Sequence, residues 1–381
     1  MKIGIITLPF NWNYGGILQN FALQWALKEL GHSSITINRI DEVNFALKDK
    51  IKIIIKRSIK KYLLRKKISL RSWPNLNELK TIKKHTDRFI DENIAVTNQV
   101  NSDADLNNIG KSDFDAFIVG SDQVWRPRYS PKIANHFLDF LKSDSTKKRI
   151  SYAASFGTDN WEYSPEQTKA CANLAKRFKA ISVREDSAVE LCRKNLGVDA
   201  IVTLDPTFLV PKWEYEKLVE KDEVEKMPGK LFNYVLDINQ EKKQVINDVG
   251  EKLNLEVFSA SAKQSFFETG KIGLKDCIYP PVTYWLRSFM DAEFILTDSF
   301  HGTAFSIIFN KPFISIGNSK RGLSRFQSVL KIFGLEERLV DENELHKVFE
   351  LLKRDIDFKS VNKILAEEKD RSIRFLKDAL N

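Results

Sequence analysis

The sequence predicts two α/β domains, each built around a parallel β-sheet, because apolar strand-like runs alternate with helix-like segments in two successive blocks. The first block runs from the isoleucine-rich segment 2–8 to the apolar segment 200–204, and the second follows a polar stretch at 221–229. A length of 381 residues suits two domains. We therefore expect a first domain over residues 1–207 and a second over 208–381.

The individual elements follow from local pattern. Short apolar runs that do not alternate are typical of strands buried on both faces, and we expect such strands at 2–8, 34–40, 115–120, 149–156, 180–183, 200–204, 231–236, 255–259, 293–297 and 312–316. Helical spacing of apolar residues predicts helices at 18–30, 165–178, 186–195, 242–253, 304–309 and 361–380, the first of them ended by Gly31. Parallel sheets bind ligands at the carboxyl ends of their strands, so the turns at 13–16, 121–123 and 299–303 are candidate site segments.

Composition narrows the class of protein. Hydrophobic residues make up 43% and charged residues 29%, which excludes wholesale disorder. The three cysteines lie far apart, which excludes a zinc ribbon or a disulfide framework. The start of the chain lacks the pattern of a secretory signal, and no apolar run approaches the roughly 20 residues that span a bilayer. We expect a soluble cytoplasmic protein.

Positive charge is concentrated in one segment. Residues 48–71 contain eleven lysines and arginines and one acid, whereas the whole chain has a net charge of +9. The rest of the chain is therefore near neutral, which argues against a nucleic-acid partner. The segment has the pattern of a basic amphipathic helix, which suits peripheral binding to an anionic membrane surface. A helix that packs on the protein body with its basic side in water is an equally good interpretation.

The segment 297–304 carries the strongest chemical signal. An apolar strand ends there in Asp298, Ser299, His301 and Thr303, and a helix begins at once. Free amides at a helix start, together with the hydroxyls of Ser299 and Thr303, can bind an anion, and His301 could give it a proton. The alternative is an ordinary helix N-cap beside a structural histidine.

Five other residues, in three segments, could add charge to the same cleft. Arg184 follows a predicted strand and could hold a carboxylate or phosphate, although it could equally form a surface pair with Glu185. Asp122 lies in a small-residue turn. Lys320, Arg321 and Arg325 follow the strand 312–316, either in the cleft or on a solvated basic turn.

Metal and nucleotide-cofactor motifs were not found. The other four histidines show no metal-ligand spacing, and no HExxH occurs, so we expect no metal site. Gly15-Gly16 is not a GxGxxG fingerprint, and a P-loop lysine motif is missing, which disfavours dinucleotide and P-loop chemistry.

Six segments in order resemble the polysaccharide pyruvyl transferase family. They are 13–19 (NYGGILQ), 117–125 (FIVGSDQVW), 151–157 (SYAASFG), 181–185 (ISVRE), 205–207 (DPT) and 297–305 (TDSFHGTAF). Each segment alone is a weak signal, but their order is specific, and the resemblance extends from residue 3 to about residue 339.

The resemblance implies two Rossmann-like domains that face a cleft, as in the GT-B glycosyltransferases. It implies that phosphoenolpyruvate is the co-substrate, without a further cofactor, and that pyruvate is attached as a ketal to a sugar or lipid-linked oligosaccharide of a surface glycan such as a capsule or exopolysaccharide. The first domain would hold the acceptor, and the second, with the terminal helix, the donor.

The resemblance also assigns residues. His301 would be the general acid or phosphate clamp, and Asp122 a base or a group that orients a hydroxyl. The expected donor-binding residues are Arg184, Ser299, Gly302, Thr303, and Lys320 or Arg321; the expected acceptor-binding residues are Asn13, Tyr14, Gly15 and Gln123. Some members of the family carry an arginine where this sequence has Ser299, so charge for the donor must come from elsewhere, or the donor differs.

Two other functions fit the pattern. One is a GT-B glycosyltransferase that uses a nucleotide sugar, although the second domain lacks a recognisable acidic nucleotide-binding motif. The other is a membrane-associated scaffold of a glycan-assembly complex, which only the basic segment supports.

Overall fold

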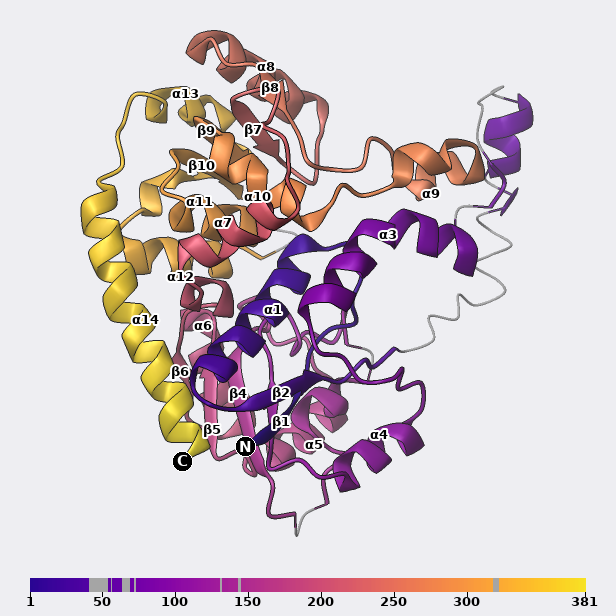
Figure 1. Ribbon diagram of the computed structural model, residues 1–381, viewed down its shortest axis with the longest axis vertical. Helices are drawn as coiled ribbons and strands as arrows, with labels where there is room; N and C mark the ends of the chain where they lie inside the picture. Colours follow the sequence, from indigo (N-terminus) through magenta and orange to yellow (C-terminus); the bar gives the residue numbers. More distant parts are fainter. Residues whose placement is uncertain are drawn as a thin grey trace.

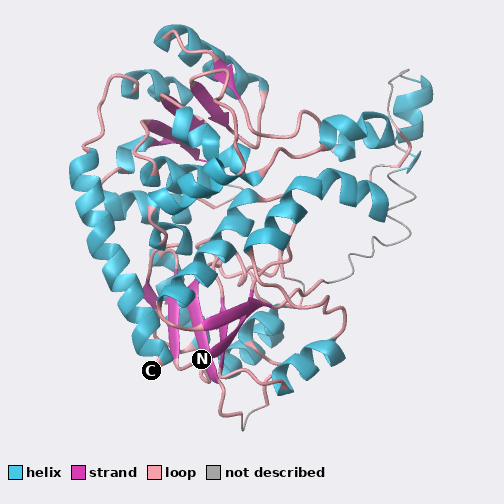
Figure 2. Cartoon of the chain, viewed as in Figure 1, coloured by secondary structure: helices cyan, strands magenta, loops and turns pink. Residues whose placement is uncertain are grey.

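The chain forms two α/β domains, one above the other, with a long helix along one side (Figure 1; Figure 2). The computed structural model describes residues 1–40, 54–55, 57–63, 69–71, 73–130, 132–142, 145–317 and 322–381. Half of the predicted basic helix, 12 of the 24 residues 48–71, therefore lies outside the described residues. Within them, no helix has the length and apolar character needed to cross a membrane.

The first sheet has six parallel strands in the order β2-β1-β3-β4-β5-β6. Its central strands are buried on both faces, which explains why they appear in the sequence as apolar runs without alternation. The strands are β1 (Lys2–Ile6), β2 (Ser33–Thr36), β3 (Ala116–Val119), β4 (Lys148–Ala154), β5 (Ala180–Val183) and β6 (Ile201–Val202).

The second sheet has five parallel strands in the order β11-β10-β9-β7-β8. They are β7 (Leu231–Tyr234), β8 (Val257–Phe258), β9 (Phe294–Thr297), β10 (Phe313–Gly317) and β11 (Leu339–Asp341). Two domains with parallel sheets are thus confirmed. The strand β11 was missed, because its three residues are too short to form a recognisable apolar run.

Helices connect the strands and cover the sheets. In the first domain they are α1 (Tyr14–Glu29), α3 (Leu76–Asn93), α4 (Asp103–Lys111), α5 (Pro165–Ala175) and α6 (Asp186–Leu191). The later ones are α7 (Lys212–Lys221), α8 (Gln240–Leu253), α9 (Phe266–Thr269), α10 (Val282–Asp291), α11 (Phe300–Ile308), α12 (Ser324–Phe333), α13 (Val348–Leu351) and α14 (Phe358–Leu380). Many begin at a side-chain cap of the expected type, such as Asn13 before α1 and Ser299 before α11.

The terminal helix α14 does not belong to the second domain alone, as the sequence interpretation assumed. It runs along both domains (Figure 1). Val361 near its start packs in the core that the two domains share, whereas Leu376 and Leu380 near its end pack with Ile3 and Ile5 of the first sheet. The apolar face of α14 therefore fastens the two domains together.

Each sheet has one point at which the strand order reverses. In the first sheet the chain moves outward in opposite directions from β1 and from β3, and in the second sheet from β7 and from β9. Loops that leave neighbouring strands at such a point diverge and open a crevice, which is the general ligand site of parallel α/β sheets. The loops after β1, β3, β7 and β9 are the segments that meet between the two domains.

Candidate active site

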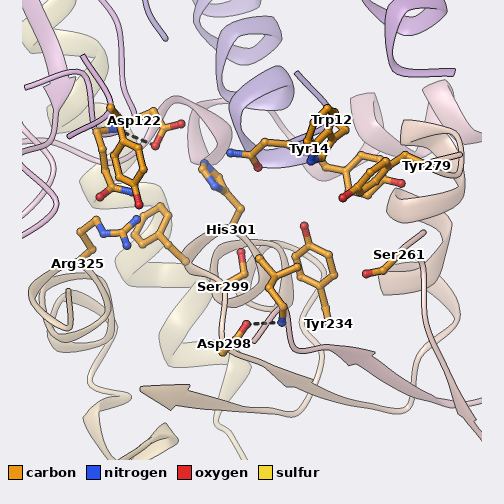
Figure 3. Close-up of a pocket in the computed structure, with 15 residues that line it drawn as sticks. Trp12, Tyr14, Asp122, Tyr234, Ser261, Tyr279, Asp298, Ser299, His301 and Arg325 are labelled. Atoms are coloured by element: carbon orange, nitrogen blue, oxygen red, sulfur yellow. Dashed lines mark hydrogen bonds between the residues drawn. The ribbon is translucent and has the colours of Figure 1, made fainter. Parts of the chain in front are cut away.

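A pocket of about 340 Å³ lies between the domains, where the two reversal points face each other. Figure 3 shows its residues converging from both domains, with His301 near the centre. The first domain contributes the loops after β1 and β3, and the second contributes the ends of β7 and β9 and the starts of α11 and α12. The lining residues are Trp12, Asn13, Tyr14, Asp122, Gln123, Tyr129, Tyr234, Leu236, Ser261, Tyr279, Asp298, Ser299, Phe300, His301 and Arg325.

His301 lies in the first turn of α11. The side chain of Ser299 caps this helix by accepting a hydrogen bond of 3.4 Å from the amide of Gly302. The imidazole points away from the second domain toward α1 (Figure 3) and is only 6% exposed. Its Nε2 lies 3.6 Å from Oδ2 of Asp205, which is an ion-pair distance when the ring is protonated. His301 therefore presents its ring to the pocket with one nitrogen beside a buried carboxylate.

Asp205 is a fully buried carboxylate behind His301. Its Oδ2 accepts hydrogen bonds of 2.8 Å from Nη1 of Arg184 and 2.8 Å from the hydroxyl of Ser121, and its Oδ1 accepts from the amide and hydroxyl of Thr207. Burial alone would raise the pKa of Asp205, but its interactions with His301, Arg184 and Thr207 lower that pKa below its ordinary value. Asp205 is therefore a fixed negative charge beside His301 and Arg184.

Arg184 lies directly beneath the pocket. Its guanidinium packs on the ring of Phe300, with Cζ 4.3 Å from the centroid, and its Nη2 lies 3.7 Å from Oδ1 of Asp122. The interpretation as a surface pair with Glu185 is wrong, because both side chains are buried and Arg184 pairs with Asp205. The Nε and Nη2 atoms of Arg184 have no hydrogen-bond partner among the described residues. Contact between Arg184 and the donor remains a prediction, and these two nitrogens are the atoms that could make it.

Asp122 has a strained backbone. Its φ of 81° lies in a region that residues other than glycine rarely occupy, and such strain is concentrated at functional sites. Its Oδ1 accepts a hydrogen bond of 2.8 Å from the amide of Gln123, and the carboxylate forms part of the pocket wall (Figure 3). The side chain of Gln123 is held in turn by Nη1 of Arg126 at 3.1 Å. The tight turn after β3 thus presents one carboxylate and one amide to the pocket.

Arg325 supplies the pocket with a cationic side chain from α12. It is buried, and burial together with the charge of Arg184 lowers its pKa to about 10, so it stays protonated at neutral pH. In Figure 3 it points toward the region between Asp122 and His301. Arg325 therefore supplies positive charge to the pocket that Ser299 also lines.

Aromatic rings form another part of the pocket wall. Trp12 and Tyr279 are stacked with centroids 5.6 Å apart, and Trp12 is partly exposed. The ring of Tyr14 also lines the pocket, but its hydroxyl donates to the carbonyls of Ala260 and Pro280 at 3.2 and 2.9 Å. Tyr14 therefore anchors α1 to the second domain, while the Trp12–Tyr279 pair offers a flat apolar face beside polar groups.

Apart from Arg184, described above, and Gly15, described below, the predicted site residues fall into three groups. Those that line the pocket are Asn13, Tyr14, Asp122, Gln123, Ser299 and His301. Gly302 and Thr303 lie within α11 and support its start: the amide of Gly302 bonds to Ser299, and the hydroxyl of Thr303 lies 2.6 Å from that of Ser315. Lys320 and Arg321 lie outside the described residues.

Gly15 is required by a close approach. A Cβ atom on Gly15 would lie 2.0 Å from Nδ1 of His301, whereas a Cβ on Gly16 would make ordinary contacts of 3.4 and 3.5 Å with Asn13 and Asp122. We expect Gly15→Ala to displace the imidazole and lower kcat/KM about 100-fold, since an error of about 1 Å in a catalytic group costs that much. Turnover assays and thermal melting check this expectation.

The matched control is Gly16→Ala, which adds the same methyl group to the next residue of the same helix. We expect it to keep most of the activity. Equal turnover by the Gly15 and Gly16 variants would contradict the proposed contact with His301.

Sequence reasoning missed several residues of the site. Asp205 was noted only as part of a motif, although its place after a predicted strand could have marked it. Arg325 was considered but not assigned, because its distance in sequence from His301 gives no sign that both face one pocket. The stack of Trp12 on Tyr279 joins two domains and leaves no local signal.

The fold defines the broad class. Two solved structures similar to this chain are S. aureus MnaA with UDP (TM-score 0.52, 12% identity, covering 100% of this chain and 97% of that one) and UDP-N-acetylglucosamine 2-epimerase from Rickettsia bellii (TM-score 0.51, 11% identity, 100% and 97%). At these identities the likeness concerns the fold alone. The predicted GT-B-like fold is thereby confirmed.

The family is shown by the sequence itself. The chain belongs to the polysaccharide pyruvyl transferase family, whose family model matches residues 13–320. The match begins at the turn that opens the pocket and includes His301, Asp205 and Arg184, and it identifies the protein as a transferase. No curated protein matches the chain in sequence.

Proposed function

We propose that this transferase moves pyruvate from phosphoenolpyruvate to two hydroxyls of a sugar in a surface-glycan intermediate, forming a ketal. The observation that carries the proposal is the convergence of His301, Arg325 and Asp122 on one pocket at the meeting of the two sheets' reversal points. Two groups that can carry positive charge and one carboxylate suit a donor with two anionic groups and a hydroxyl acceptor.

The donor has two anionic groups, a carboxylate and a phosphate, and so needs two anion sites. Arg325 offers a planar guanidinium that can hold either group with two parallel hydrogen bonds. His301 and the amides at the start of α11 offer the second site, where the helix dipole also favours negative charge. Arg184 pairs with Asp205 but keeps Nε and Nη2 without a hydrogen-bond partner among the described residues, so these two nitrogens could contact the donor.

The reaction requires proton transfer at carbon. Protonation of the methylene carbon of phosphoenolpyruvate, by His301 as general acid, leaves a cationic centre at C2 that a sugar hydroxyl attacks. Phosphate then leaves with its electron pair, and a second hydroxyl attacks C2 to close the ketal. The two attacking hydroxyls release two protons. One returns to His301, which gave its proton to the methylene carbon, and the other leaves with phosphate. Asp122 is placed to accept the proton of an attacking hydroxyl.

The acceptor has polar and apolar partners in the same pocket. Asn13 and Gln123 can hydrogen-bond sugar hydroxyls, and the Trp12–Tyr279 stack can cover an apolar sugar face. Because these groups come from both domains, we propose that the acceptor binds across the cleft rather than to the first domain alone.

Ligand-induced stabilisation tests the choice of donor. Phosphoenolpyruvate should raise the melting temperature, because a ligand that binds only the native state stabilises it by mass action. A shift with a nucleoside diphosphate sugar and none with phosphoenolpyruvate would replace the proposal with a glycosyltransferase function. Inorganic phosphate serves as the control for unspecific anion binding.

Arg325→Gln is expected to weaken binding of phosphoenolpyruvate at least tenfold, because the variant loses the charge of the guanidinium but keeps hydrogen-bonding capacity. Titration calorimetry measures the dissociation constant. A matched control is Arg287→Gln, since Arg287 pairs with Asp291 within α10 and lies outside the pocket lining. An unchanged dissociation constant in the Arg325 variant would remove Arg325 from the donor site.

A further inference from the structure

Two segments far apart in the sequence form one surface at the edge of the protein. Residues 54–63, where described, lie beside α9 and the turns that follow it (Figure 1). Arg57 joins them: its guanidinium donates to the carbonyls of Ser69, Phe267 and Glu268 at 2.6, 2.5 and 3.0 Å. The amide of Ser69 donates to the carbonyl of Thr269 at 3.3 Å.

In a helix that packs on a protein body, apolar side chains face the body and charged side chains face solvent. On this surface the arrangement is reversed. Arg57 is buried and points inward. Large apolar side chains point outward instead and are 49 to 66% exposed: Ile55, Ile59, Tyr62, Phe267 and Ile272, which we call the docking surface. Contiguous exposed apolar side chains on a soluble domain mark a surface that contacts a partner.

Lysines lie beside the docking surface and outnumber the one exposed acid there, Glu268. Lys271 and Lys275 are exposed beside Ile272, and Lys61 precedes Tyr62. In the sequence, residues 48–71 contain eleven bases and one acid. Apolar side chains within a basic region suit an anionic bilayer, where the apolar groups insert among acyl chains and the bases contact headgroups. Two copies of this chain would instead bring like charges together at the same surface.

We propose that the docking surface binds the protein to an anionic membrane. A buried cluster of Ile82, Phe266 and Cys277 lies between it and the pocket wall: Tyr279 packs against this cluster and stacks on Trp12. The membrane proposal itself does not depend on the identity of the donor.

Vesicle co-sedimentation of the full chain tests the proposal. The protein should bind vesicles made of equal parts of phosphatidylcholine and phosphatidylglycerol, but not vesicles of phosphatidylcholine alone, and binding should weaken as salt rises. The double variant Phe267→Ser, Ile272→Ser should bind at least tenfold more weakly, since it removes two inserting side chains. Its melting temperature and its turnover of a short soluble acceptor should match those of the wild type.

The control is the double variant Trp213→Ser, Ile201→Ser, which removes two apolar side chains of 49 and 46% exposure elsewhere on the protein. It should bind vesicles like the wild type. Equal binding to neutral and anionic vesicles, or unchanged binding of the Phe267 and Ile272 variant, would overturn the proposal. A concentration-dependent dimer that this variant loses, without vesicle binding by the wild type, would also overturn it and assign the surface to self-association.

Discussion

His301→Ala is expected to lower kcat/KM about 1,000-fold or more while the fold remains intact, which is the largest effect on catalysis that the structure predicts. Removing a general acid typically costs a factor of about 100 to 10,000. The fold should survive because the buried pair of Asp205 and Arg184 persists without the imidazole. Phosphate release from phosphoenolpyruvate, measured beside thermal melting, checks both parts.

Two variants sharpen this experiment. His301→Gln keeps a side-chain N–H that can hydrogen-bond, but the amide cannot act as a general acid. If this variant binds phosphoenolpyruvate better than His301→Ala and still shows no turnover, the role of His301 as general acid is distinct from its role in binding phosphate. His346→Ala removes an exposed histidine and should leave activity unchanged. Wild-type turnover by a folded His301→Ala variant is incompatible with the proposed role.

Asp205→Asn is expected to have the largest effect on stability, a loss of about 3–5 kcal/mol in the free energy of unfolding. The variant removes the carboxylate that Nη1 of the buried Arg184 contacts at 2.8 Å, and only the longer contact of 3.7 Å with Asp122 remains. Urea denaturation measures this loss. The matched control is Asp186→Asn, whose exposed partner Lys331 lies 3.0 Å away, and which should change the free energy of unfolding by no more than about 0.5 kcal/mol.

The pH dependence of the same comparison gives a second test. The pKa of Asp205 is lower in the folded than in the unfolded chain, so its stabilising contribution is complete above the unfolded value of about 3.9 and declines as the pH falls below it. The difference in unfolding free energy between wild type and Asp205→Asn should therefore narrow below about pH 4. A difference that stays constant down to pH 3 would mean that the carboxylate charge is not its source.

Most of the fold could be predicted from the sequence because parallel strands buried on both faces form apolar runs. The start of α11 was expected at the right turn, since an apolar strand, Ser299 and His301 follow one another directly. Helices α3, α7, α10 and α12 were not predicted. Their apolar residues are sparse, or are spaced to fit the core that both domains share, so the sequence shows no clear helical stripe. The path of α14 depends on contacts with Ile3 and Ile5, which lie at the other end of the chain.

The candidate site could be predicted only in part, because several of its residues depend on contacts between distant parts of the chain. His301 and Asp122 follow strands and carry a local signal, and both line the pocket. The burial of Arg184 depends on Asp205, 21 positions away, and the position of Arg325 depends on how α12 packs. The outward apolar side chains beside the buried Arg57 oppose the usual pattern of an amphipathic helix, so only the structure could show which side of that segment faces solvent.

Incubation of the protein with phosphoenolpyruvate and a glycan intermediate, with phosphate release and product mass followed together, tests the central claim most directly. The account predicts that each phosphate released is matched by one pyruvate attached to the acceptor, and that Arg325→Gln and His301→Ala suppress both signals together. Transfer of a sugar from a nucleotide sugar to the acceptor, without consumption of phosphoenolpyruvate, would contradict the account.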